Sequence, residues 1–314
     1  MTHHWGYVGA ISSALLFGVS STLNKIALEN VHPLVIAGLI YFVGGVLLFG
    51  IHLSPLHKKL LSLFETPTET ETTISKKDYK TLTFVILFGS VLAPIMLLYG
   101  LNETTAINAS LLLNTESFFT VLIALTFFKE RGTRKDYLAI LLLIVGVVFL
   151  TTRGEFSKVT LSTEATGNLL IVGACLSWGI DNNLSKFLSK KRDIVKVTGI
   201  KCTIGGAALL LTSLLLGVNL SIPLVSIPYI LSAGAFSIAF SILLFLFSLR
   251  EIGSMRTGIV FSVSSLFGAL FAFIVLREAL SPVQLIAGAV MLFGVYILFK
   301  KPKHTEEKQQ SPPR

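Results

Sequence analysis

One short pattern occurs twice in the chain, as FGVSSTLNK at 17–25 and as WGIDNNLSK at 178–186. Each stretch has an aromatic residue before a glycine, and a lysine seven residues after that glycine. A shift of 161 residues lays the first stretch on the second and also lays Gly6 on Gly167. A constant offset that matches charges and glycines indicates an internal duplication.

The duplication continues toward the end of each half with a different offset. A shift of 148 residues brings Glu103 onto Glu251 and Glu130 onto Glu278. The change from 161 to 148 falls near the long polar segment at 54–80, where extra length leaves the apolar segments intact. The sequence therefore predicts two repeats, at 1–152 and 153–300, followed by a disordered tail at 301–314.

The composition predicts that both repeats lie in a membrane. Hydrophobic residues make up 53% of the 314 positions and charged residues only 14%, whereas soluble domains are about one quarter charged. A membrane-spanning helix needs about 20 mainly apolar residues. Ten segments meet this requirement: 6–28, 33–53, 81–101, 105–128, 136–152, 167–188, 194–217, 227–249, 254–276 and 282–299.

Five helices per repeat give the two halves opposite orientations. An odd number of crossings forces the second repeat to enter from the other side, so we expect an all-α protein of two inverted five-helix repeats. Many transporters have this architecture, with the substrate site near the membrane midplane between the repeats.

Basic residues predict the orientation. Of the 26 Lys and Arg, 21 lie in the gaps and the tail that would be cytoplasmic if the N-terminus is cytoplasmic, and four lie on the other side. Positive residues accumulate in cytoplasmic loops, so we expect both termini, and the loop at 54–80, in the cytoplasm and the protein in the cell (inner) membrane. The net charge of +9 is explained by this distribution, and we expect no nucleic-acid partner.

These residues resemble the EamA-like repeat of the drug/metabolite transporter superfamily. The stretch LLLNTESFFTVLIALTFFKERGTRKDYLAILLLIVGVVFL at 111–150 is similar to the end of that repeat, with Glu116 at the mid-helix break and Glu130 at the turn. Two positions depart from the family pattern. Ser117 stands where proline is common, which argues against a kinked fourth helix, and Ser264 replaces the mid-helix acid in the second half.

Glu116 is our first candidate for coupling or substrate binding. It lies about eleven residues into the fourth helix, hence near the midplane, and Asn114 lies close to it in the sequence. A desolvated carboxyl disfavours its charged form, which suits proton coupling or binding of a cationic group. The alternative is a structural carboxyl that is hydrogen-bonded to a neighbouring helix.

A second candidate group lies on the sixth helix. Ser177, Asp181 and Ser185 share one helix face, and Trp178 lies beside them. The matched first-repeat positions that continue this polar stripe are Ser20 and Asn24. The alternative to a binding role is hydrogen bonding between helices. For Lys25 we expect a side chain that reaches the membrane interface.

The leading hypothesis is a secondary transporter that moves a small metabolite, such as an amino acid or a drug-like compound, by alternating access. Within this hypothesis we expect export or exchange of the metabolite, with proton coupling as an option. A membrane enzyme acting on lipid-linked substrates is the alternative, but it would need converging His, Asp or Arg side chains at an interface, and we expect none. A channel is a weaker option. No Walker A, HExxH or GxSxG motif occurs, so we expect no enzyme, no cofactor and no metal site. The expected partners are a small-molecule substrate and the lipid bilayer, with the chain a monomer or a homodimer.

Overall fold

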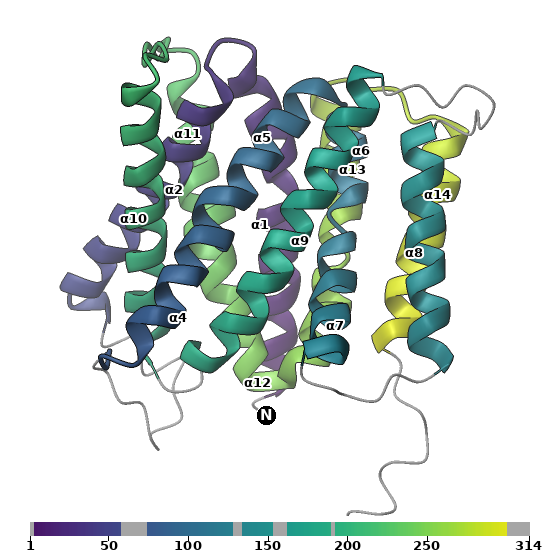
Figure 1. Ribbon diagram of the computed structural model, residues 1–314, viewed down its shortest axis with the longest axis horizontal. Helices are drawn as coiled ribbons and strands as arrows, with labels where there is room; N and C mark the ends of the chain where they lie inside the picture. Colours follow the sequence, from purple (N-terminus) through teal and green to yellow (C-terminus); the bar gives the residue numbers. More distant parts are fainter. Residues whose placement is uncertain (1–2, 58–73, 128–133, 153–161, 190–191, 300–314) are drawn as a thin grey trace, which may run out of the picture.

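The computed structural model describes residues 3–57, 74–127, 134–152, 162–189 and 192–299. Within these ranges every regular element is a helix, and the helices stand side by side as one bundle (Figure 1). The first repeat contains α1 (His3–Leu28), α2 (Pro33–Leu53), α4 (Asp78–Val85), η1 (Ile86–Leu92), α5 (Ala93–Glu103), α6 (Ala106–Leu112), α7 (Thr115–Phe127) and α8 (Arg134–Thr152). The second contains α9 (Thr163–Ser189), α10 (Ile194–Leu215), α11 (Ile227–Ser232), η3 (Ala233–Phe240), α12 (Ser241–Phe261), α13 (Ser264–Val275) and α14 (Pro282–Phe299).

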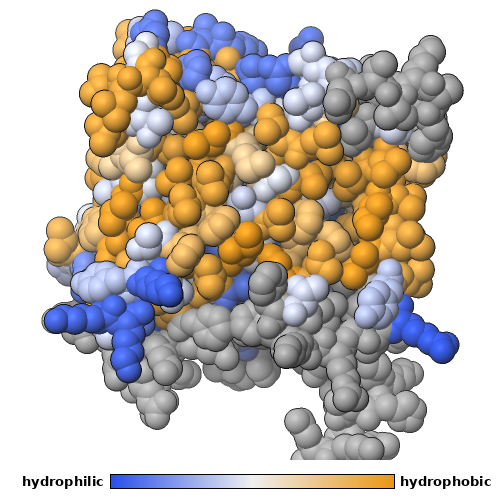
Figure 2. All heavy atoms as spheres, in the orientation of Figure 1, coloured by the Kyte–Doolittle hydropathy of each residue, from blue (hydrophilic) through white to orange (hydrophobic). Residues whose placement is uncertain are grey.

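The outer surface of the bundle is apolar. Figure 2 shows a band of hydrophobic side chains across the middle of one face, with hydrophilic residues above and below it. Large apolar side chains such as Leu141, Ile274 and Phe293 are more than half exposed. Among the described residues, five segments are long and apolar enough to span a membrane: Trp5–Leu28, Pro33–Leu53, Asp78–Glu103, Ile194–Leu215 and Ile227–Ser248. Such a surface is stable in lipid, where helices satisfy their own backbone hydrogen bonds.

The fourth predicted helix is broken, so the argument against a kink from the missing proline was wrong. Helix α6 ends at Leu112 and α7 begins at Thr115. The break satisfies its backbone without a proline, because the Thr115 hydroxyl donates to the Leu112 carbonyl at 2.7 Å and the Asn114 N–H donates to the Leu111 carbonyl at 3.2 Å. Local side-chain hydrogen bonds of this kind compete with the helical ladder.

The eighth and ninth predicted helices are joined without a coil, since α12 covers the end of one and the start of the other. The rings of Phe245 and Phe261 nevertheless lie 4.8 Å apart. A straight helix would separate these residues by about 24 Å, so α12 reverses direction between them. The two legs therefore run in opposite directions, and they correspond to the two segments that the sequence predicted as separate helices.

Both repeats carry the same backbone irregularities at matched positions. The offset of 148 places the π-helical segment η1 on η3, and the α6–α7 break within one residue of the α12–α13 break. Pro94 follows η1, but its matched residue is Ile242, so the proline does not explain the π-helical turn. π-helical turns are rare and often mark functional sites.

Contacts between the repeats are reciprocal. A Cβ added to Gly45 of α2 would meet Thr203 of α10, and a Cβ added to Gly206 would meet Phe42, the residues that the offset of 161 exchanges. Farther along the same pair, Gly38 faces Leu210. The residue numbers rise along α2 as they fall along α10, so these matched helices run antiparallel. Reciprocal contacts are the property of a twofold relation.

Two ends of the bundle can be defined from side-chain contacts. At the Lys25 end, the Lys25 ammonium donates to the carbonyls of Leu101 and Thr104 at 2.7 and 2.6 Å. A cation is favoured at the carbonyl end of a helix such as α5. That Lys25 reaches the membrane interface stays a prediction. Glu278, which precedes α14, accepts from the N–H groups of Ala106 and Ile107 at the start of α6. The other end, where α1 begins and α14 ends, is called the Asp193 end.

Candidate substrate site

A buried ion pair lies between α9 and α10. The Lys201 ammonium is 2.6 Å from Oδ2 of Asp181, and both side chains are at most one tenth exposed. The other carboxylate oxygen of Asp181 accepts from the Ser185 hydroxyl at 2.7 Å. Each charge therefore has a partner, which a charged group away from water requires.

Glu116 faces this pair from the first turn of α7. Its Oε1 accepts from the Asn182 amide at 2.7 Å, and Asn182 follows Asp181 on α9. The same amide is 3.4 Å from the Thr120 hydroxyl. Glu116 is half-buried, whereas the neighbouring acid Asp181 is buried. With its neutral partner, an ionised Glu116 would leave the site one negative charge in excess, which favours a proton or a cationic ligand group.

The π-helical segment η1 provides the room for the ion pair. A Cβ added to Gly89 would collide with the carboxylate of Asp181, so Gly89 lets α9 and η1 approach. The Gly89 carbonyl accepts from the Trp178 indole N–H at 3.1 Å. Trp178 in turn meets Phe17 of α1 edge to face, with ring centroids 6.1 Å apart. Trp178 and Phe17 together form an aromatic surface beside the charged side chains. We call Glu116, Asp181, Asn182 and Lys201 the charged cluster.

Other predicted residues lie near this cluster but outside its hydrogen bonds. Asn114 donates to the Ser265 hydroxyl of α13 at 2.9 Å, which links the two repeats. Ser177 bonds back to the Gly173 carbonyl of its own helix at 3.1 Å. Ser20 and Asn24 are buried on α1, and the Asn24 amide oxygen has no hydrogen-bond partner among the described residues.

Sequence reasoning missed Lys201 as a site residue. Its signal was present, since it lies seven residues inside the predicted helix 194–217, beyond the basic residues at the helix ends. An ionisable residue at membrane depth faces a partner or a pathway by default, and Asp181 is that partner. The matched lysine Lys186 and the turn residue Glu130 lie outside the side chains that the structure describes.

The Lys25 end holds a second polar network. Asn108 donates to Glu164 at 2.9 Å and accepts from Gln284 at 2.8 Å, while Thr104 donates to Asn168 at 2.7 Å. These bonds tie the starts of α6, α9 and α14 together. This end is therefore cross-linked by hydrogen bonds.

A third group lies at the Asp193 end, where His52, His57 and Asp193 converge. The expectation that no such side chains converge was wrong. Residues 52 and 57 are far from 193 in the sequence, and only the antiparallel pairing of α2 and α10 brings them together.

The EamA-like transporter family matches the chain at residues 4–152 and 165–300. The chain belongs to the EamA-like transporter family. Both repeats match, which agrees with the duplication seen in the sequence.

Relatives agree with this assignment. A protein of Methanothermobacter thermautotrophicus named "Uncharacterized transporter" is 44% identical over 299 residues, covering 95% of this chain and 87% of the relative. The Bacillus subtilis protein named "Uncharacterized transporter YoaV" is 24% identical, and the match covers 91% of this chain and 93% of the relative. One solved crystal structure aligns with a TM-score of 0.65 at 15% identity, covering 93% of this chain and 96% of that one, which shows a shared fold. The chain is thus an integral membrane protein of a transporter family.

Proposed function

We propose that this EamA-like protein is a secondary carrier of ten membrane-spanning helices in two inverted five-helix repeats. It moves a small metabolite by alternating access, in export or exchange. The reciprocal contacts of antiparallel α2 and α10 support an axis in the membrane plane, because an axis along the membrane normal would make matched helices parallel. The charged cluster carries the functional proposal.

The substrate is a small amphipathic metabolite with an amino group, such as an amino acid. Asp181 and Lys201 offer opposite charges within 2.6 Å, so an ammonium and a carboxylate on one ligand could each replace one partner. Trp178 and Phe17 offer an aromatic surface to the apolar part of that ligand, and can also contact its cation. With the ligand ammonium at Asp181 and its carboxylate at Lys201, Glu116 is left to take a proton.

The position of Glu116 supports coupling to protons. An acid with a neutral hydrogen-bond partner can gain and lose a proton without breaking an ion pair. The Asp181–Lys201 pair, by contrast, is stable as a charged unit. Glu116 is therefore the proposed carrier of the coupled proton.

The Asp193 end faces the cytoplasm in this proposal, because α1 begins and α14 ends there and the distribution of basic residues predicts cytoplasmic termini. Cysteine labelling tests this. A membrane-impermeant reagent added outside cells should modify a cysteine placed at the exposed Asn102 and not one at the exposed Ser75. The reverse pattern would contradict the orientation. The native Cys175 and Cys202 are buried, which favours a low background of labelling.

In this proposal the protein acts as a monomer or homodimer in the cell membrane.

The substrate is found by thermal-shift screening of the purified protein against amine-bearing metabolites. A ligand that binds the folded state raises its melting temperature. Each hit is then offered to proteoliposomes, and the carrier proposal requires saturable uptake that accelerates when unlabelled hit is present inside. Binding without transport of any hit would count against a carrier.

A further inference from the structure

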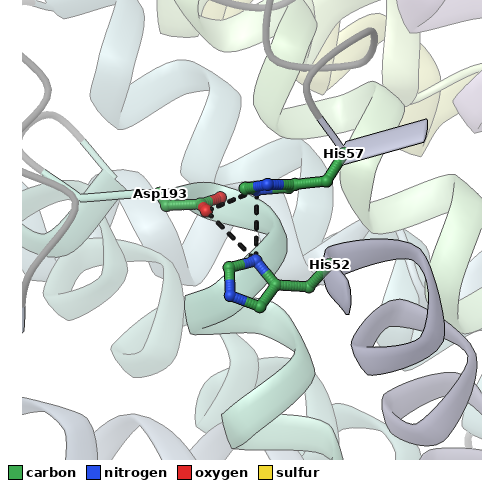
Figure 3. Close-up of side chains that lie close together, drawn as sticks. All are labelled: His52, His57 and Asp193. Atoms are coloured by element: carbon green, nitrogen blue, oxygen red, sulfur yellow. Dashed lines mark hydrogen bonds and ion pairs between the residues drawn. The ribbon is translucent and has the colours of Figure 1, made fainter. Parts of the chain in front are cut away.

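The Asp193 end contains a three-residue group that the transport proposal does not use. His52 lies in the last turn of α2, His57 follows it, and Asp193 precedes α10 (Figure 3). Nε2 of His57 is 2.7 Å from Oδ2 of Asp193, and Nδ1 of His52 is 3.1 Å from that His57 nitrogen and 3.5 Å from the same oxygen. Three ligand-type atoms therefore point toward one position.

These separations suit a metal ion. Two imidazole nitrogens and one carboxylate oxygen form a familiar donor set for zinc. Donors about 2.0–2.1 Å from a tetrahedral ion lie about 3.3 Å apart, close to the 2.7–3.5 Å found here. An ion would take the place of the proton shared between His57 and Asp193, and the group would widen slightly around it.

The rest of the helix start fixes the carboxylate. Oδ1 of Asp193 accepts from the N–H groups of Val195 and Lys196 at 2.9 and 3.3 Å, which caps α10. Oδ2 is then left to face the two histidines. The split between capping oxygen and free oxygen orients the ligand in advance, as outer hydrogen bonds do in metal sites. The histidines are partly exposed, at 23% and 16% of their side chains, so an ion and a fourth ligand from solvent can enter.

We propose that His52, His57 and Asp193 form a binding site for one divalent transition-metal ion of the zinc class. Helix α2 belongs to the first repeat and α10 to the second. A bound ion therefore joins the two repeats at the Asp193 end. The positive charge of Lys196 nearby works against the ion, so moderate affinity is expected rather than a permanent structural metal.

Equilibrium dialysis with Zn²⁺ tests the site on the full-length, tag-free protein in detergent after chelator treatment. We expect one ion per chain in the wild type. His57→Ala and Asp193→Asn should each weaken binding by at least about tenfold, since even outer-shell partners of metals contribute about 10- to 100-fold. Asp193→Asn is the sharper variant, because asparagine also caps helices and should leave α10 and the melting temperature in place.

Two controls separate this site from other histidines. His32→Asn replaces a histidine at the opposite end, where it caps α2, and should keep wild-type binding. Joint replacement of His3 and His4 by alanine should also keep it. The proposal is overturned if the wild type binds no Zn²⁺, if Asp193→Asn binds as the wild type does, or if the His3 and His4 variant loses the ion. Co²⁺ in place of Zn²⁺ should give the visible spectrum of a four-coordinate ion that Asp193→Asn lacks.

Discussion

The charged cluster and its counterpart across the repeat differ in chemistry but not in backbone. On one side, α9 and α10 meet η1 and α7 and hold buried charges. On the other, α1 and α2 meet η3 and α13 with the same π-helical turn and the same helix break. The matched residues are Ser20 for Asp181, Ile40 for Lys201, Ser264 for Glu116 and Ser237 for Gly89.

This difference separates framework from function. Reciprocal glycine contacts recur in both halves, because close helix approach is needed wherever the repeats meet. The charged residues of the cluster have uncharged counterparts in the other half, where the helices pack in the same way. The charges are therefore not needed for this helix packing. Phe17 and Trp178 are matched residues, and their rings contact each other. Matched residues can touch only near the pseudo-twofold axis that relates the halves, so α1 and α9 cross near that axis. Asp181 lies three residues from Trp178, about 4.5 Å along the helix, so the charges lie beside that crossing.

The largest effect should follow from removing one member of the ion pair. Lys201→Met leaves Asp181 buried and unpaired, which should cost about 3–5 kcal/mol of stability. The matched change Ile40→Met keeps an apolar group and should cost less than about 1.5 kcal/mol. Unfolding of the purified variants in detergent measures both. Adding Asp181→Asn to Lys201→Met should restore much of the loss, and equal losses for Lys201→Met and Ile40→Met would remove the distinction between the halves.

A smaller effect is expected where η1 meets the ion pair. Gly89→Ala places a methyl group against Asp181 and should cost about 1–3 kcal/mol through overpacking. The matched variant Ser237→Ala loses one hydrogen bond to the Leu16 carbonyl, worth about 1 kcal/mol. Melting temperatures should therefore fall further for Gly89→Ala. If Gly89→Ala melts like the wild type, the close approach of η1 to Asp181 is wrong.

The smallest effect concerns the bond between the repeats. Asn114→Ala removes the amide that donates to Ser265, and such bonds in membrane bundles contribute about 0.6 kcal/mol on average. Ser265→Ala should have a similar effect, and the double variant should be less destabilised than the sum of the two. Strict additivity in this double-mutant cycle would show that the two side chains do not interact.

The sequence predicted an all-helical membrane protein of two repeats, but it did not predict the full site. Offsets and apolar length predicted the crossings, because a spanning helix must be long and apolar whatever its neighbours are. Glu116 and Asp181 stood out as acids in apolar segments, whereas Asn182 as a partner depended on helix rotation. The break after Leu112 arose from Thr115 and Asn114, which sequence reasoning did not weigh against the missing proline. The convergence of His57 with Asp193 depended on pairing across the repeats, which no local pattern encodes.

The central claim is that Glu116 couples transport to protons and that its matched residue Ser264 does not. Transport by variants at these two positions tests it. The measurement is uptake, by proteoliposomes, of a metabolite selected in the thermal-shift screen, first driven by a pH gradient and then as exchange at equal pH. Glu116→Gln should abolish the gradient-driven uptake and retain exchange, because a permanently neutral side chain still lets the loaded carrier reorient. Ser264→Ala should retain both. Wild-type uptake with wild-type pH dependence in Glu116→Gln would contradict the account and leave Glu116 a structural residue.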